Sequence, residues 1–191
     1  GEVEFLSDRM RAKRFPVILL CVKSKDTSAS VAEATPLLED GGIMISMQNG
    51  LNNWEALSER VGEERTVGAR VIFGSEVTKP GQVRVTVNAD NVLLGEPFLP
   101  VNRTLLERVQ RDLSYSGIPT RVVDKKEIWA AIWGKVLYNC SLNPLGALLE
   151  VPYGKLGESP ETREIMRQVI REIFLVIRAK GIEVPYRDGE E

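Results

Sequence analysis

The stretch FPVILLCV at residues 15–22 decides how the first half of the chain folds. It is a continuous apolar run rich in β-branched residues, which is typical of a strand buried on both faces of a parallel sheet. A second such run, GIMISM at residues 42–47, lies between two helical patterns at residues 28–38 and 52–61. Strand, helix, strand, helix in this order predicts an α/β unit with a parallel sheet.

Side chains that can accept a hydrogen bond from free backbone N–H groups stand at the start of both helical patterns. We expect Thr27 or Ser28 to cap the first helix and Asn52 to cap the second. Pro36 is expected to disturb the end of the first helix, because proline has no backbone N–H to donate.

The pattern changes after the second helix. Turn signals at Pro80-Gly81 and Ala89-Asp90 separate short stretches that favour strands, and these predict an antiparallel extension of the sheet. An amphipathic helix and a closing strand follow. The predicted strands cover residues 66–73, 82–87, 91–94 and 120–123, and the predicted helix covers residues 102–114.

From Lys125 onward the patterns are helical. Residues 127–149 are apolar on nearly all sides, which predicts a buried helix, and Pro144 should kink or break it. Ser159 and Pro160 are suited to the cap and first position of another helix, with its body at residues 162–180.

The fold class predicted from these elements is α/β followed by all-α. We assign residues 1–123 to a partial Rossmann-like nucleotide-binding domain with an antiparallel extension of its sheet. Residues 124–191 are assigned to a helical substrate-binding and catalytic domain.

Composition excludes several functions. The 191 residues carry a net charge of -2 without a clustered basic excess, so no nucleic-acid partner is predicted. No apolar run approaches the roughly 20 residues of a membrane span, and no signal peptide is evident, so a cytoplasmic protein is expected. The chain has no histidine, which excludes a Ser-His-Asp triad, a Cys-His pair and an HExxH zinc site, and no metal site is predicted. Cys21 and Cys140 lie in apolar segments and are expected to be core thiols without a disulfide.

Three polar residues share one face of the long helix. Lys135, Asn139 and Asn143 project within an arc of about 80° at 100° per residue. One interpretation is that the lysine extends its ammonium to solvent and the asparagines bond the backbone. The other is that the face lines a polar cleft, in which Lys135 donates a proton and the asparagines hold an oxygen-rich small molecule. Three costly polar groups on one buried face favour the second interpretation.

Two further candidates follow the predicted parallel strands. Lys23 stands just after the first strand and Asn49 just after the second. Ligands of open α/β sheets bind beyond the carboxyl ends of the strands. Asn49-Gly50 alone could be only a turn, but with the polar helix face these strand ends make a consistent candidate site.

The segments that carry these residues resemble the ketopantoate reductase family. They are VKSKDT at residues 22–27, QNGLNNWE at residues 48–55 and WGKVLYNCSLNPL at residues 133–145. The last matches the pattern W-x-K-x-x-x-N-x-x-x-N-P-L, and Pro152-Tyr153-Gly154 also fits. The resemblance implies NADPH-dependent reduction of 2-dehydropantoate to pantoate, in pantothenate and coenzyme A biosynthesis. It also implies a helical domain of the 6-phosphogluconate-dehydrogenase C-terminal type.

The resemblance also implies a role for each candidate residue. Lys135 corresponds to the general acid that protonates the carbonyl oxygen as hydride arrives. Asn139 and Asn143 correspond to residues that hold the substrate. Asn49 corresponds to an asparagine near both the substrate and the nicotinamide, and Lys23 to a lysine near the cofactor NADP.

The chain departs from the family pattern at both ends. It contains no G-x-G-x-x-G turn for a pyrophosphate, and it ends before the family's C-terminal serine and glutamate. We therefore expect it to be an internal part of the enzyme. Two alternatives remain open, a related reductase of another 2-keto acid or opine-type substrate and a non-catalytic helical dimerisation or scaffold module. Preference for NADP over NAD and the oligomeric state, including a homodimer, are not fixed by the sequence.

Overall fold

The computed structural model of the chain describes residues 13–186, which divide after Lys125 into two compact units. Residues 1–12 and 187–191 of the two predicted domains lie outside the described residues. Each unit is described by itself below.

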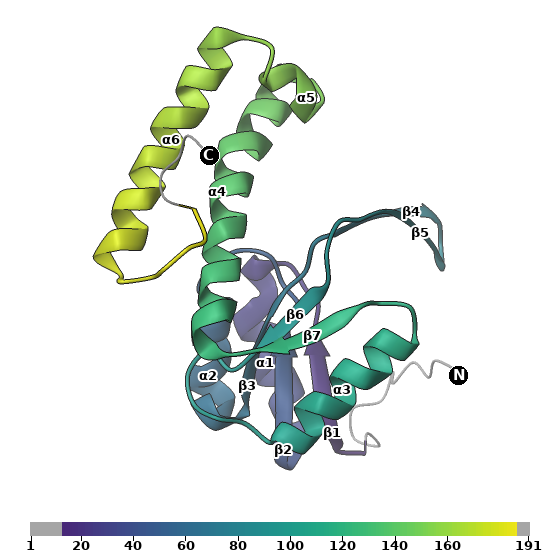
Figure 1. The fold of residues 1–191 in the computed structure, drawn as a ribbon. Helices are drawn as coiled ribbons and strands as arrows, with labels where there is room; N and C mark the ends of the chain where they lie inside the picture. The colour runs from purple at the N-terminus through teal and green to yellow at the C-terminus, as the bar shows by residue number, and fades with distance from the viewer. Residues whose placement is uncertain (1–12, 187–191) are drawn as a thin grey trace. The chain divides into compact units, whose positions relative to one another are not determined.

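The first unit contains a five-stranded sheet with the strand order β1-β2-β3-β6-β7 (Figure 1). The first three strands are parallel, β6 runs antiparallel to β3, and β7 runs parallel to β6. This arrangement confirms the predicted parallel sheet with an antiparallel extension. The strands are β1 (Phe15–Leu20), β2 (Leu38–Ser46), β3 (Thr66–Arg70), β6 (Val92–Gly95) and β7 (Thr120–Val123).

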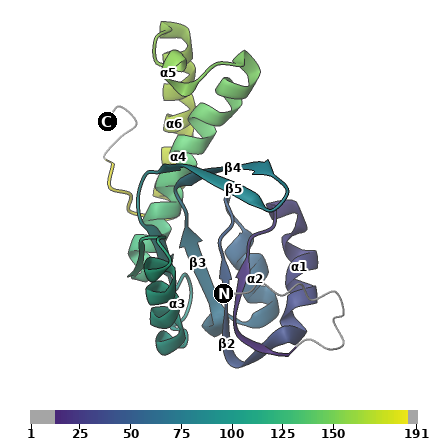
Figure 2. The same ribbon diagram turned by 90° about the vertical axis from the view of Figure 1, so that its right-hand side faces the viewer.

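Helices cover both faces of this sheet (Figure 2). Alternation along β2 explains why: Ile43 and Ile45 pack with Leu106 of α3 (Arg103–Tyr115), whereas Met44 packs on the opposite face. The partners of Met44 include Leu57 of α2. The helices on the face of Met44 are α1 (Thr27–Ala34) and α2 (Asn53–Val61), and short 3-10 turns lie at Ser24–Asp26, Thr35–Leu37 and Glu63–Arg65.

A β-hairpin forms a separate two-stranded sheet. Its strands are β4 (Phe73–Lys79) and β5 (Gln82–Asn88), which pair only with each other. The prediction of one strand over residues 66–73 is therefore wrong, because β3 ends at Arg70 and the chain leaves the main sheet before Phe73. The alternating valines of β5 are exposed, so an alternation typical of a half-buried strand does not place this strand on a core.

The second unit consists of helices. They are α4 (Lys125–Leu149), α5 (Tyr153–Leu156) and α6 (Pro160–Ala179), and α6 returns alongside α4 (Figure 1). Ser159 caps α6 by accepting hydrogen bonds from the backbone N–H groups of Glu161 and Thr162, as predicted. An ion pair between Lys126 and Glu183 joins the segment after α6 to the first turn of α4.

The helix α4 does not break at Pro144 but continues to Leu149, so the break that was one of the two expected effects of this proline does not occur. The helix is also not buried throughout. Ile128, Ile132 and Trp133 are buried, but Leu148 is 80% exposed in the last turn.

Caps and cysteines also differ from expectation. Asp26, not Thr27 or Ser28, holds the cap position of α1, and Asn52 precedes α2 without a capping hydrogen bond from its side chain. Both cysteines are free and exposed rather than core residues. Among the described helices, none is long and apolar enough to cross a bilayer.

Candidate functional site

Lys23 and Asn49 lie at neighbouring strand ends. Leu20 of β1 pairs with Ser46 of β2, and each candidate residue stands three positions further along its chain. Both residues are exposed. The structure therefore brings these two together at the carboxyl edge of the sheet, where ligands of open α/β sheets bind.

A buried network of uncharged polar groups ties the two strand ends together. The Gln48 side-chain amide donates to the Val22 carbonyl oxygen at 2.9 Å and to Thr27 Oγ1 at 2.8 Å, and its oxygen accepts from Ser46 Oγ at 3.0 Å. Thr27 Oγ1 in turn donates to Asn53 Oδ1 at 3.0 Å. Gln48 thereby links the segment after β1, which carries Lys23, to the segment that carries Asn49.

Asn53, the first residue of α2, completes the link. Its Nδ2 donates to the Asn49 carbonyl oxygen at 2.9 Å and to Ser24 Oγ at 3.2 Å. Ser24 Oγ donates to the same Asn49 carbonyl at 2.9 Å. The backbone of Asn49 is thus held by two donors while its side chain remains exposed. Sequence reasoning missed Gln48 and Asn53 as supporting residues. The available signal was a polar side chain two residues after Ser46, the last residue of β2.

Replacing Gln48 with leucine is expected to lower the free energy of unfolding by about 1–3 kcal/mol, because buried hydrogen-bond partners are left unsatisfied. Urea denaturation of the complete gene product measures this. Gln82→Leu, at the exposed first residue of β5, is the matched control and should change stability little. Equal stability of the Gln48 variant and wild type would show that the network contributes nothing.

The other three candidates share one face of α4. Lys135 and Asn139 are half-buried, and Asn143, two turns beyond Lys135, is exposed. Their spacing of four residues within a continuous helix confirms the predicted common face. All three lie in the second unit, whereas Lys23 and Asn49 lie in the first.

Asn143 has a partner that sequence reasoning did not find. The Tyr153 hydroxyl, on α5, donates to Asn143 Oδ1 at 2.6 Å. The Tyr153 ring stands edge-on to that of Tyr138, with centroids 6.0 Å apart. Ten residues separate Asn143 from Tyr153 across a turn, so no helical or strand period could have predicted the contact.

The last residue of β3 is a buried arginine. The Arg70 side chain is 7% exposed and its Nη2 donates to Asp90 Oδ2 at 2.8 Å. Its Nη1 is buried and has no hydrogen-bond partner among the described residues. The hydrogen bond from Arg70, together with one from the Asn91 backbone N–H, holds the pKa of Asp90 below its usual value of 3.8.

This ion pair makes part of the stability depend on pH. A carboxyl group whose pKa is lower in the folded state stabilises above its unfolded pKa, and the contribution disappears as the pH falls through the folded pKa. Asp90→Asn should therefore reduce stability at neutral pH by not more than about 1 kcal/mol, because much of the Asp90 side chain is exposed. The difference from wild type should shrink as the pH falls below the usual pKa of this carboxyl group and vanish once the folded-state carboxyl is protonated, as measured by denaturation across pH.

The control for the Asp90 variant is Asp40→Asn, which removes a carboxylate whose side chain is 99% exposed and pairs with Arg14. A stability difference for the Asp90 variant that stays constant down to acid pH would rule out the ion pair as its cause.

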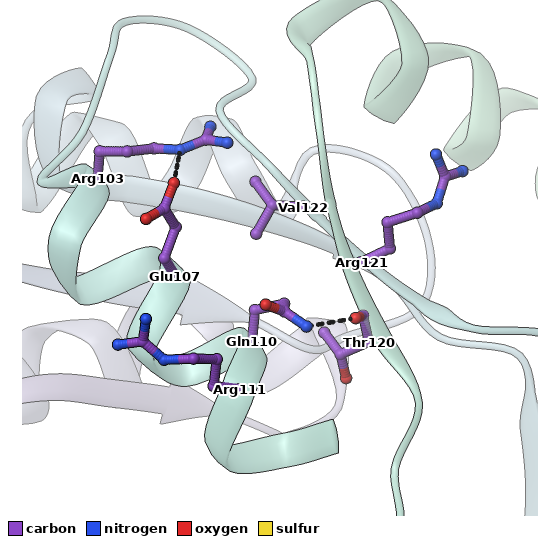
Figure 3. A pocket seen from close by; sticks show the side chains of 7 residues that line it. All are labelled: Arg103, Glu107, Gln110, Arg111, Thr120, Arg121 and Val122. Carbon is purple, nitrogen blue, oxygen red and sulfur yellow. Dashed lines mark hydrogen bonds and ion pairs between the residues drawn. The ribbon is translucent and has the colours of Figure 1, made fainter. Parts of the chain in front are cut away.

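A groove of ≈ 340 Å³ lies between α3 and β7 (Figure 3). None of the five candidate residues lines it. Glu107 in the groove already accepts a hydrogen bond from Arg103 at 2.9 Å, and Gln110 donates to the Thr120 carbonyl oxygen at 2.9 Å. Its remaining lining residues are Arg111, Arg121 and Val122.

Two family descriptions match the chain. Residues 3–97 match "Ketopantoate reductase PanE/ApbA", and residues 127–191 match "Ketopantoate reductase PanE/ApbA C terminal". The 2-dehydropantoate 2-reductase of Aquifex aeolicus is 37% identical over 190 residues, which cover 100% of this chain and 58% of that protein. The chain thus spans little more than half the length of this relative.

Solved structures agree with the fold. The 2-dehydropantoate 2-reductase of Geobacter metallireducens is 29% identical with a TM-score of 0.80, covering 93% of this chain and 57% of that one. A D-mandelate dehydrogenase solved with NADH and anilino(oxo)acetate has a TM-score of 0.80 at 19% identity, covering 91% of this chain and 54% of that one, and this likeness concerns the fold alone.

The fold class is therefore that of a Rossmann-like sheet followed by a helical region. Within this class, the chain belongs to the ketopantoate reductase family.

Proposed function

We propose that the complete gene product reduces 2-dehydropantoate to pantoate with NADPH, and that Lys135 is the general acid. The observation that carries the proposal is the common face of Lys135, Asn139 and Asn143 on α4, in a chain of the ketopantoate reductase family. A protonated lysine supplies the one proton that a reduced carbonyl oxygen needs, and no histidine competes for the role in this chain.

The candidate residues of the sheet fit a nicotinamide cofactor. Lys23 and Asn49 present an ammonium and an amide, both exposed, at neighbouring carboxyl ends of parallel strands. Such donors suit the oxygen-rich groups of a dinucleotide. When bound, the cofactor supplies the hydride to the keto carbon. Lys23 and Asn49 orient it, and the Gln48 network holds their backbone in place.

On the substrate side, Asn139 and Asn143 hold oxygens of the 2-keto acid, and Lys135 Nζ gives its proton to the keto oxygen. The carbonyl π bond breaks, a C–H and an O–H bond form, and the product is the 2-hydroxy acid. The lysine is left neutral and regains its proton from solvent. The protein therefore needs only to position the substrate and the cofactor and to supply one proton.

A second candidate is reduction of a different 2-keto acid. It is favoured by the likeness in fold to a D-mandelate dehydrogenase, whose bound anilino(oxo)acetate also carries adjacent carbonyl and carboxyl groups. The common face on α4 would serve either substrate.

The test is a steady-state assay of the complete gene product with 2-dehydropantoate and a series of other 2-keto acids, each with NADPH and with NADH. The highest kcat/KM is expected for 2-dehydropantoate with NADPH. A higher kcat/KM for another 2-keto acid would favour the second candidate. Absence of turnover with every 2-keto acid, from a folded protein that carries a G-x-G-x-x-G turn, would favour a non-catalytic module.

A further inference from the structure

One of the two polar atoms of the Asn143 side-chain amide has a hydrogen-bond partner. Its Oδ1 accepts the hydroxyl hydrogen of Tyr153 at 2.6 Å. Among the residues that the structure describes, Nδ2 of Asn143 has no hydrogen-bond partner, and the residue is exposed. An amide nitrogen carries two donor hydrogens and accepts nothing, so the open end of Asn143 is a donor.

The Tyr153 ring has contacts on one side, and the residue is 44% exposed. Its ring lies over Gly146, where an added Cβ would stand 3.0 Å from Cε1 and 3.2 Å from Cδ1. The edge-on ring of Tyr138 lies 6.0 Å away. The backbone turn between α4 and α5 is closed by a hydrogen bond, in which the Val151 N–H donates to the Gly146 carbonyl oxygen at 3.2 Å. These contacts place the Tyr153 hydroxyl beside Asn143.

We propose that Tyr153 is a positioning residue that fixes the Asn143 amide with its nitrogen outward, so that the site accepts an oxygen of a 2-keto acid rather than a donor group. The proposal rests on the proposed function. A carboxamide without a partner can turn by half a rotation and present either its oxygen or its nitrogen to a ligand. The contact with the Tyr153 hydroxyl selects one of these orientations, because its 2.6 Å separation from the amide fits an O–H···O bond and is shorter than the N–H···O bond that the turned amide would have to form.

The consequence concerns binding more than chemistry. Tyr153 is assigned no contact with the proton donor Lys135 or with the reacting carbon, so its loss weakens substrate binding and leaves proton transfer unchanged. The variant Tyr153→Phe keeps the ring on Gly146 and removes only the hydroxyl.

The experiment compares Tyr153→Phe, Asn143→Ala and the double variant in the complete gene product, with 2-dehydropantoate as substrate. Tyr153→Phe is expected to raise KM about threefold to tenfold, the range of one net hydrogen bond, with kcat within about twofold of wild type. In the Asn143→Ala background the same change should leave KM unaltered, because the residue it positions is absent. Cofactor affinity and melting temperature should stay close to those of wild type.

Three outcomes overturn the proposal. An unchanged KM in Tyr153→Phe shows that the hydroxyl does not orient the amide. An equal rise in KM with and without Asn143 shows that Tyr153 acts by another route, and a fall in kcat at constant KM places its role in the chemical step. Failure of the proposed function is distinct, because then the wild-type protein itself reduces no 2-keto acid.

Discussion

Lys135→Ala is expected to lower kcat for 2-dehydropantoate by about 10²–10⁴-fold, the range that loss of a positioned general acid produces. The residue is half-buried on the α4 face that also carries Asn139 and Asn143. Cofactor affinity should change little, because the proposed cofactor contacts, Lys23 and Asn49, lie in the other compact unit. Steady-state kinetics and titration with NADPH on the complete gene product measure the two quantities.

Two companion variants sharpen this result. Lys135→Arg keeps the positive charge, but a guanidinium does not release its proton near neutral pH, so activity should not return. Recovery of activity in the arginine variant would show that the charge, and not proton donation, matters. Lys180→Ala removes an exposed lysine after α6 and should behave as wild type. Undiminished turnover of Lys135→Ala would remove this residue from the mechanism.

Local sequence patterns predicted the elements that local forces decide. The strand at residues 120–123 and the helix opened by Ser159 and Pro160 are where the sequence places them. In both cases the deciding signals, a short run bounded by turns and a capping side chain next to proline, act within a few residues.

Predictions failed where distant segments compete for the same groups. Thr27 does not cap α1, because its hydroxyl donates to Asn53 and accepts from Gln48 in the buried network. The hairpin strand β5 has the alternation of a half-buried strand, yet Val83 is 64% exposed. The pairing and burial of a strand depend on the segments that pack against it, and these cannot be identified from the sequence of the strand alone.

In the candidate site, too, the features set by local sequence were predicted and those set by distant contacts were not. The common face of Lys135, Asn139 and Asn143 follows from helical spacing alone, so the sequence was sufficient for it. The contact from Tyr153 to Asn143 depends on a turn after α4 that begins with Glu150 in the left-handed region, at φ 53°. Residues other than glycine rarely adopt this conformation, and the sequence gives no reason to expect it of a glutamate.

Leu106→Ala should lower the free energy of unfolding by about 2–5 kcal/mol, a large part of the roughly 5–15 kcal/mol that stabilises a typical protein. Leu106 of α3 is 0% exposed and packs with Ile43, Ile45 and Leu94 of the sheet. Denaturation by urea measures the change. Leu99→Ala makes the same substitution at a side chain that is 48% exposed and should cost about 1 kcal/mol or less. Equal effects of the two variants would contradict the packing of α3 on the sheet.

The Leu106→Ala variant also tests whether stability and kcat change independently. Leu106 packs on the face of the sheet opposite to Met44 and Leu57, whereas the Gln48 network bonds Asn53, the first residue of α2, through Thr27. Loss of the Leu106 side chain should therefore leave kcat of the folded protein near the wild-type value while stability falls. Lys135→Ala should lower kcat and leave stability near the wild-type value, because a half-buried polar side chain contributes little to the core. A fall in kcat of the folded Leu106 variant would show that the α3 core and the chemical step are coupled.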